Sequence, residues 1–478
     1  MGETKGALRH SLVTLILFYK QKILRMKKLI TIVFIFSALS LSMQAQAQDN
    51  AKDGSLQKYR RSSLATMMVY HPEDEFGKDI REAYEKIPVP DKYDDHDMGL
   101  KVLENEWFYN VQGKDKSGLY KASFTKKLTA SNIEKNGRAI EQFLNKSNVG
   151  LYMVAKWFNI SSEDPATATF NMELIKERGQ YDATALDVQN AKLTTRGLAT
   201  LSDAGEELLG QTFILINDMT YVTAEERAAA AKVALGILGA IGDAFTGDKT
   251  GSDLAQAASD FADSFTGFKV MNHSYLYQLQ WNDSVAAIFY NNYYTEVPDE
   301  AKMSAFMNDT SLFKVKYVAH EYEFDSNSTF KGKYERSDLV KLNCTRSQDK
   351  NVAALQVAYE DFKLKTPIYE VKMNDAGKIE GYTAKVGMKE GITEKSKFQV
   401  IQRIVDPNTN KTRYKYVATL KPVKGKIWDN RYMAAEEKSD AANFDATFFK
   451  KTGGGEIYPG MLIIEGKYRK VVEWLVDS

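Results

Sequence analysis

Residues 275–281 read YLYQLQW and alternate like a half-buried strand, which indicates β structure in this part of the chain. Its odd-numbered residues are aromatic or aliphatic, whereas Gln278 and Gln280 stand between them. The turn-forming residues 282–284 follow, so we expect residues 285–290 to return as the second strand of a hairpin. Upstream, the apolar run 212–219 predicts another, buried strand.

Helical patterns surround these strands. In residues 131–145 the apolar side chains recur every three or four positions, which predicts a helix. Residues 59–86 and 352–362 are also predicted to be helical, whereas residues 151–160 alternate like a strand. Strand and helix patterns in separate runs indicate the α+β class, with a mixed main domain over residues 101–366.

The most distinctive segment of the main domain is residues 223–268, which predict a helical hairpin. Thr223 and Glu226 form a capping box at its start. Between Ala228 and Ile241 the only charged residue is Lys232, so the first arm of the hairpin is apolar on nearly all sides. Glycines recur there at every third position and would permit a close approach of another helix.

Two interpretations of the apolar hairpin stay open at this point. It could be a buried cover over a sheet, or it could contact a membrane surface or a partner chain. The first arm is too short to span a bilayer, which needs about 20 residues. The residues predicted to make such a contact are Leu235, Ile237, Leu238, Ile241, Phe261 and Phe265.

The last hundred residues change in character. Residues 397–402 and 413–420 alternate, and the turn-rich segment 406–411 joins them. We therefore predict a small, β-barrel-like C-terminal domain over residues 367–478.

The N-terminal region indicates export. Residues 26–47 combine a basic start, a short apolar run and an Ala-x-Ala cleavage site, which together are typical of a secretory signal peptide. Residues 1–25 do not fit this pattern, so we expect them to be a misassigned extension. Residues 48–100 would form an N-terminal helical segment. The predicted location is periplasmic or secreted, with association to the outer membrane left open.

Charge and cysteine content disfavour nucleic acid as a partner and exclude an intramolecular disulfide. The 478 residues carry a formal net charge of +1, and residues 1–47 hold seven basic residues against one acidic residue. The exported chain would therefore be mildly acidic, which disfavours nucleic acid as a partner because such binding needs cations that neutralise phosphates. Cys344 is the only cysteine, so no intramolecular disulfide can form, and we expect it to be a small buried strand residue.

No motif points to a catalytic, cofactor-binding or metal-binding residue. His71, His96, His273 and His320 are not spaced like metal ligands, and each is predicted to be a surface or capping histidine. The run from Asp91 to Asp97 is rich in carboxylates but lacks the glycine of a calcium loop, so a solvated loop is expected. No cofactor is predicted.

Short motifs resemble three known groups of proteins. Residues 60–64 and 87–93, with the signal peptide, resemble an uncharacterised family of secreted Bacteroidetes proteins, which implies a location only. Residues 384–392 and 397–400 are similar to the C-terminal barrel of flagellar assembly protein T, and residues 204–218 are loosely similar to curli-secretion lipoproteins. The chain departs from the last group because it lacks a lipid-bearing cysteine after the signal. Together these resemblances imply a role in envelope assembly.

The sequence thus predicts a non-enzymatic cell-envelope protein that binds or assembles through the apolar hairpin. Its partner would be an envelope protein or a membrane surface, and self-association is left open. The alternative is a secreted hydrolase that acts on glycan or peptide through carboxylates brought together by folding. An open cleft with converging carboxylates would favour the alternative.

Overall fold

The structure is a computed structural model. It describes residues 62–467, except for residues 75, 110, 114–115, 124–126, 177–206, 223–268, 327–335, 406–411 and 435–443. Within the described part, residues 62–96 and 101–467 belong to one compact unit, which contains every helix and strand named below, and residues 97–100 fall outside it. The α-helices with described bounds are α3 (Gly77–Tyr84), α4 (Ala130–Lys146), α5 (Val149–Trp157), α11 (Asp283–Asn292), α12 (Glu300–Met307) and α13 (Arg336–Ala358).

The first sheet, here called the mixed sheet, has the strand order β2-β1-β4-β5-β6, with β3 paired to β1. Strand β1 runs parallel to β2, β3 and β4. Strand β5 lies between β4 and β6 and is antiparallel to both. The strands are β1 (Ser63–Tyr70), β2 (Asp94–Asp95), β3 (Val102–Glu104), β4 (Thr212–Tyr221), β5 (Lys269–Leu279) and β6 (Val315–Ser326).

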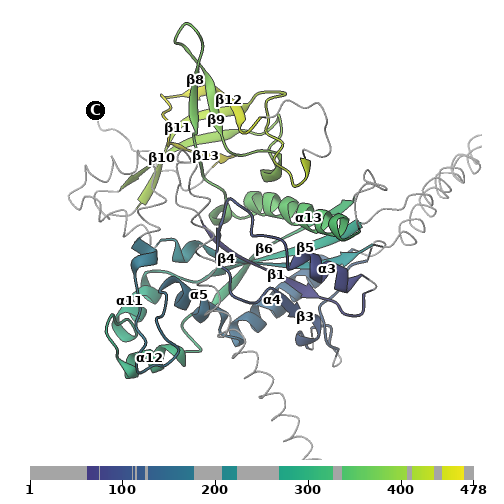
Figure 1. The fold of residues 1–478 in the computed structure, drawn as a ribbon, viewed down its shortest axis with the longest axis vertical. Helices are drawn as coiled ribbons and strands as arrows, with labels where there is room; N and C mark the ends of the chain where they lie inside the picture. The colour runs from purple at the N-terminus through teal and green to yellow at the C-terminus, as the bar shows by residue number, and fades with distance from the viewer. Residues whose placement is uncertain are drawn as a thin grey trace, which may run out of the picture. The chain divides into compact units, whose positions relative to one another are not determined.

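Helices cover both faces of the mixed sheet (Figure 1). On one face, Val340 and Cys344 of α13 pack with Val270 of β5 in a buried cluster. On the other face, the Tyr277 hydroxyl donates a hydrogen bond of 2.9 Å to the carbonyl of Gly137 in α4. A Cβ atom at Gly137 would lie 2.7 Å from the Tyr317 ring, so glycine lets α4 approach the sheet closely.

The face beneath α13 also contains a buried layer of polar side chains. Asn217 Nδ2 donates to the Tyr84 hydroxyl at 2.9 Å and to Gln348 Oε1 at 3.0 Å. Asn217 Oδ1 accepts from Asn272 Nδ2 at 3.0 Å and from the Ser274 hydroxyl at 2.6 Å. Buried polar groups are stabilising only when they are hydrogen-bonded, so this layer fixes how α13, α3 and the strands sit together.

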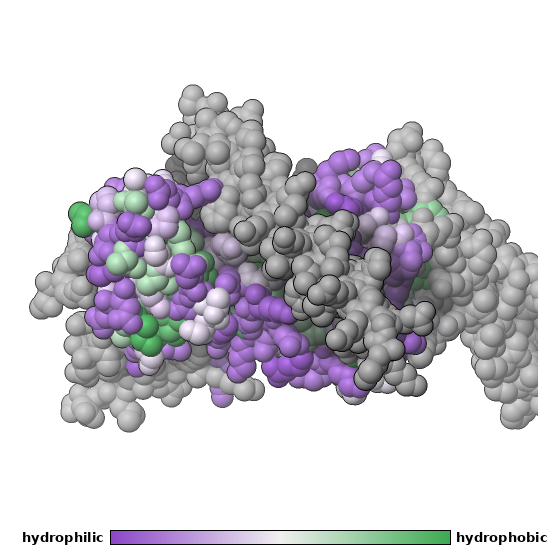
Figure 2. Space-filling view, turned by 90° about the horizontal axis from the view of Figure 1, so that it is seen from below, coloured by the Kyte–Doolittle hydropathy of each residue, from purple (hydrophilic) through white to green (hydrophobic). Residues whose placement is uncertain are grey.

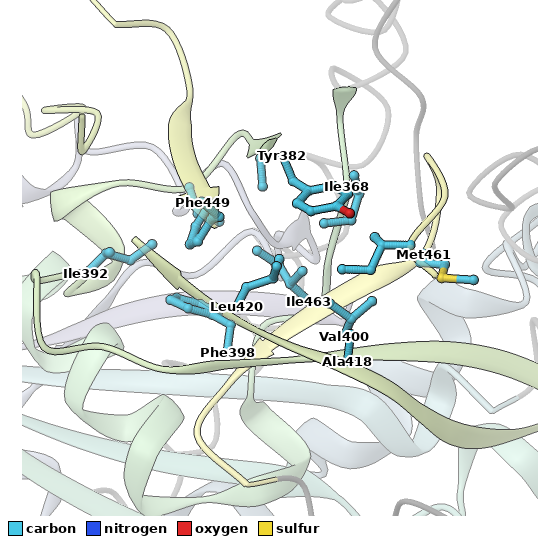
Figure 3. Close-up of a cluster of buried hydrophobic side chains, with 13 residues drawn as sticks. Ile368, Tyr382, Ile392, Phe398, Val400, Ala418, Leu420, Phe449, Met461 and Ile463 are labelled. Carbon is cyan, nitrogen blue, oxygen red and sulfur yellow. The ribbon is translucent and has the colours of Figure 1, made fainter. Parts of the chain in front are cut away.

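The second sheet, here called the curled sheet, is a half-barrel with the order β7-β13-β10-β11-β12-β9-β8 and antiparallel pairing throughout. Its strands are β7 (Thr366–Pro367), β8 (Glu370–Met373), β9 (Ile379–Ala384), β10 (Phe398–Val405), β11 (Thr412–Pro422), β12 (Thr447–Gly454) and β13 (Leu462–Glu465). The concave side is filled by apolar side chains from most of the strands (Figure 3). This core includes Tyr382, Phe398, Leu420, Phe449 and Ile463.

An aromatic cluster joins α11 and α12 to the rest of the unit. Phe289 of α11 lies at its centre, with ring centroids 4.5 Å from Phe158, 5.2 Å from Phe170 and 6.0 Å from Phe306. The exposed surface of this region mixes polar residues with isolated apolar ones (Figure 2). Among the apolar ones, Ile288 is 42% exposed.

Several predicted elements are confirmed. The helix expected at 131–145 is α4, and the strands expected at 212–219 and 275–281 are contained in β4 and β5, apart from the last two residues of the second. The predicted C-terminal hairpin corresponds to β10 paired with β11. The α+β class holds, whereas the hairpin predicted at 223–268 lies outside the described residues.

The prediction of an N-terminal helical segment over residues 48–100 is wrong in its described part, because residues 63–70 form β1 rather than a helix. This strand is buried on both faces and paired on both sides. A strand buried on both faces carries a continuous apolar run without alternation, and periodicity cannot distinguish it from a buried helix. Helix appears only later in the segment, as α3.

Two predicted strands are helices. Residues 151–160 were expected to be extended, but α5 occupies most of this range and is buried on several sides, so its apolar residues need not follow one stripe. Residues 285–290 belong to α11. Asn282, predicted as a turn residue, is the N-cap of α11, and its side chain accepts from the amides of Ser284 and Val285 at 3.0 and 3.1 Å.

Helix α13 is longer than predicted, because it begins at residue 336 rather than 352. Cys344 therefore lies in a helix and not in a strand, although it is buried as expected.

Candidate functional site

The residues predicted to contact a partner cannot be placed. Leu235, Ile237, Leu238, Ile241, Phe261 and Phe265 all lie outside the described residues. The candidate site must therefore be sought in the described part of the chain.

An open pocket of about 650 Å³ lies where α13 meets the segments that connect strands of the curled sheet. We call it the junction pocket. Its walls come from the loop after Pro90, the first turn of α13, and residues 389 and 428–434. The lining residues are Asp91, Asp338, Lys389, Trp428, Asp429, Asn430, Arg431, Tyr432, Met433 and Ala434.

Most charges in the junction pocket are paired. Lys389 Nζ lies 3.0 Å from one carboxylate oxygen of Asp91, and Lys92 Nζ lies 3.1 Å from the other. Asp429 accepts from Nε and Nη2 of Arg431 at 2.7 and 2.8 Å, a two-pronged contact that fixes both side chains. Within the described ranges no ion pair involves Asp338, which is exposed in the first turn of α13.

Backbone contacts hold the aromatic wall of the pocket. The amide of Met388 donates to the carbonyl of Trp428 at 2.9 Å, and a Cβ atom at Gly387 would lie only 2.3 Å from that carbonyl oxygen. Arg346 of α13 donates from Nε and Nη2 to the carbonyl of Tyr432 at 3.0 and 2.6 Å. The Trp428 and Tyr432 rings are thus presented by fixed backbone, with Tyr432 36% exposed.

The backbone of Met433 is strained. Its φ of 56° lies in the left-handed region, which a non-glycine residue rarely adopts. Such strain is often found at functional sites, where the surrounding structure maintains it. Its position in the pocket wall is therefore consistent with a functional role for this segment.

Two further carboxyl groups, the half-buried Glu390 and the buried Asp349, have raised pKa values. Glu390 accepts from the Gly387 amide at 2.6 Å and from Asn430 Nδ2, and burial raises its pKa. Asp349 of α13 is 8% exposed, and burial, with the nearby carboxylates of Glu390 and Asp91, raises its pKa to about 7. Asp91 differs: burial would raise its pKa, but Lys92 and Lys389 lower it to about 2.

The structure also brings together three of the histidines, which corrects their prediction as surface or capping residues. His71 Nε2 lies 2.6 Å from Asp218 Oδ1, and His273 Nδ1 lies 2.9 Å from His320 Nε2. Asp218 and His273 are cross-strand partners on β4 and β5. His71, His273 and also His96 are buried, and we call His71, Asp218, His273 and His320 the histidine cluster.

The pKa shifts within the histidine cluster run in opposite directions: the pKa of His71 is raised, whereas those of His273 and His320 are lowered. Burial would lower the pKa of His71, but the charge and hydrogen bond of Asp218 raise it. Conversely, burial would raise the pKa of Asp218, but His71 lowers it, so each partner favours the charged form of the other. Burial lowers the pKa of His273, and burial together with His273 lowers that of His320 to about 3, so these two histidines are neutral near pH 7.

The neutral histidines make the fold sensitive to acid. The pKa values of His273 and His320 are lower in the folded than in the unfolded chain. The stability that these neutral histidines contribute is therefore fully present above about pH 6.5 and is lost as the pH falls towards 3. We expect the variant His320→Gln to lose less stability than the wild type between pH 6.5 and 4. Urea unfolding midpoints at several pH values measure this, and parallel curves for the two proteins would contradict it.

Several further observations bear on the chemistry. Among the described residues, no three His, Cys, Asp or Glu side chains group closely enough to hold a metal ion. No helix in the described ranges is long and apolar enough to cross a membrane. The chain matches no protein-family model, and no curated protein gives a significant match.

Sequence spacing could not reveal the junction pocket. Asp91 and Lys389 contact each other across 298 positions, so the pocket exists only after folding. The one local signal was the carboxylate-rich run from Asp91, predicted to be a solvated loop. Asp91 is indeed exposed, with 58% of its side chain accessible, and two lysines also hold its carboxylate.

Proposed function

We propose that this chain is a non-enzymatic cell-envelope protein that binds a polar, hydroxyl-rich ligand, such as a saccharide, in the junction pocket. The observation that carries the proposal is the composition of the pocket wall. Two aromatic rings, Trp428 and Tyr432, stand beside carboxylate, amide and guanidinium groups. Planar polar groups can pair with hydroxyls, while aromatic faces cover the apolar faces of a sugar ring.

The state of the charges also supports binding. Asp91 and Asp429 are each fixed by cations, so they can accept hydrogen bonds from hydroxyls without a large rearrangement. Asp338 adds a further lining carboxylate, for which the described residues provide no ion pair. A preorganised polar wall of this kind reduces the entropy cost of binding.

The proposal is tested by removing the exposed aromatic ring. We expect Tyr432→Ala to lower the affinity for a bound glycan at least about tenfold, as truncation of a tyrosine anchor commonly does. A printed array of neutral, acidic and amino-sugar glycans would identify the probe, and titration calorimetry would measure its affinity. The stability of this variant should not change, because Tyr432 contributes its backbone carbonyl, which remains, to Arg346.

Tyr458→Ala is the matched control, since Tyr458 is exposed and does not line the pocket. Its glycan affinity should equal that of the wild type. Equal loss in both variants, or no glycan bound by the wild type, would refute a saccharide site in the junction pocket.

Hydrolysis of a bound glycan is the second candidate, favoured by three carboxylates in the pocket wall: Asp91, Asp338 and Asp429. Glycosidases use two carboxyl groups, one of which must be protonated. Asp91 and Asp429 are tied to cations, so Asp338 would have to take part. Release of reducing ends by the wild type, abolished in Asp338→Asn, would establish hydrolysis in place of binding alone.

The location and the finer architecture belong to the same proposal. The signal-like residues 26–47 support a periplasmic or secreted protein. The apolar segment 223–268 is proposed as a helical hairpin that provides a second contact, to an envelope protein or a membrane surface. Residues 367–478, which carry the curled sheet apart from the first residue of β7, are proposed as a small β-barrel-like domain.

A further inference from the structure

Exposed lysines stand on adjacent strands of the curled sheet, on its convex face. Lys421 of β11 and Lys450 of β12 are direct cross-strand partners, so they lie on the same face of the sheet. Leu420 and Phe449, which precede them in each strand, belong to the apolar core on the concave side (Figure 3). By the alternation of side chains along a strand, Lys421 and Lys450 project from the convex side. Both residues are exposed.

A third lysine continues this arrangement onto the next strand. Lys397 directly precedes Phe398 of β10, which pairs with Leu420 and also belongs to the core. The next position outward places Lys397 beside Lys421, again on the convex side, and Lys397 is exposed. We call Lys397, Lys421 and Lys450 the lysine row. Its members lie on or next to three adjacent strands, whose backbones are spaced about 4.8 Å apart.

The strands that carry the lysine row supply positive charge around it. Residues 412–426 and 447–454 contain seven charged residues, and all seven are basic. Within the described part of the chain, no ion pair involves Lys397, Lys421 or Lys450. Like charges directly opposite each other across two strands are destabilising. A bound anion would remove this repulsion, so the lysine row fits a negatively charged partner.

A lipid surface is the less suitable anionic partner for this face. Surfaces that bind anionic membranes combine cations with apolar side chains that enter the interface. Phe448 of β12 lies two residues before Lys450 and therefore on the same face. Its side chain is only 8% exposed, and Lys426 Nζ lies 4.7 Å from the ring centroid. Phe448 is thus not available to enter a membrane, whereas an acidic polysaccharide requires only the exposed charges.

We propose that the lysine row binds a linear acidic polysaccharide, a polymer that carries one carboxylate on each sugar. Such a chain repeats its charge at an interval close to the spacing of the strands, so successive carboxylates can meet successive lysines. Pairing of ammonium with carboxylate groups is charge-assisted, and it releases counterions from the polymer. None of the three lysines lines the junction pocket, so the inference does not depend on the proposed function.

Titration calorimetry of the full-length chain with polygalacturonate at low ionic strength tests the inference. We expect the wild type to bind and its affinity to fall as salt is added. The double variant Lys421→Gln, Lys450→Gln should bind at least about tenfold more weakly. The double variant Lys421→Arg, Lys450→Arg keeps both charges and should bind like the wild type. Removing two lysines that repel each other should not lower the urea midpoint of unfolding, so a loss of binding would not reflect a loss of fold.

The double variant Lys78→Gln, Lys86→Gln is the matched control, because it removes the same charge from exposed positions in and after α3, outside the curled sheet. Its affinity for polygalacturonate should equal that of the wild type. Equal loss in the two glutamine variants, or no polygalacturonate bound by the wild type, would overturn the inference. Vesicles of phosphatidylglycerol provide the lipid comparison. If Lys421→Gln, Lys450→Gln loses vesicle binding but keeps polygalacturonate binding, the lysine row is a membrane contact and the inference is wrong.

Discussion

Replacing Asp218 with asparagine is expected to lower the free energy of unfolding by about 3–5 kcal/mol near pH 6. The substitution removes the negative charge that balances His71 at 2.6 Å, and both side chains are almost fully buried. The hydrogen bond can survive with a neutral imidazole, but the ionic pair cannot. Without Asp218, burial dominates, and the pKa of His71 should fall below its usual value.

The pH window of this effect follows from the two pKa directions. The raised pKa of His71 gives stability that is complete below about 6.5 and is lost as the pH rises through its folded value. The lowered pKa of Asp218 gives stability that is complete above about 3.9 and is lost as the pH falls through its folded value. Both contributions are complete between about pH 4 and 6.5, so the variant should differ most from the wild type there.

Urea unfolding at pH 6 measures the loss, and NMR titration of His71 measures its pKa. Asp325→Asn is the matched control, because Asp325 contacts Lys350 at 2.5 Å but Lys350 is 47% exposed. A partly solvated pair of this kind contributes about 1 kcal/mol or less. If Asp218→Asn costs no more than Asp325→Asn, then His71 and Asp218 do not form an ionic pair in the folded protein.

The histidine cluster shows why the candidate sites escaped sequence analysis. His71, Asp218, His273 and His320 lie on four separate segments, and only strand pairing brings them together. Metal and catalytic motifs are found in sequence when one helix or loop supplies most of the groups. A site assembled from sheet neighbours has no fixed spacing, and the same holds for Asp91 and Lys389 in the junction pocket.

The fold was predictable where one face of an element is polar. The alternation of residues 275–281 and the helical spacing of 131–145 reflect elements with one buried and one exposed or polar side, and both predictions are confirmed. Residues 63–70 and 151–157 are buried on more than one side, so their patterns carry no period. The secondary structure of these two segments is set by tertiary contacts, because β1 is paired on both sides and α5 is largely buried.

A second large loss of stability is expected for a substitution in residues 283–292. Part of this segment was predicted to be a strand, but the segment forms helix α11. In α11 the Phe289 side chain is fully buried against Phe158, Phe170 and Trp281. We expect Phe289→Ala to lower the free energy of unfolding by about 3–5 kcal/mol, through lost apolar contact and the cavity that remains. Urea unfolding measures the loss, and near-ultraviolet circular dichroism should show weakened aromatic packing.

Two neighbours of Phe289 distinguish the helix from the strand. Ile288 is exposed, so Ile288→Ala should cost less than about 1 kcal/mol although it also removes an apolar side chain. Ala287 would share the buried face with Phe289 in a strand, but in α11 it is exposed. Ala287→Asp should therefore cost less than about 1 kcal/mol, because the new carboxylate stays in solvent. A loss of several kcal/mol for Ala287→Asp would mean that Ala287 is buried beside Phe289, and the helical assignment of this segment would have to be abandoned.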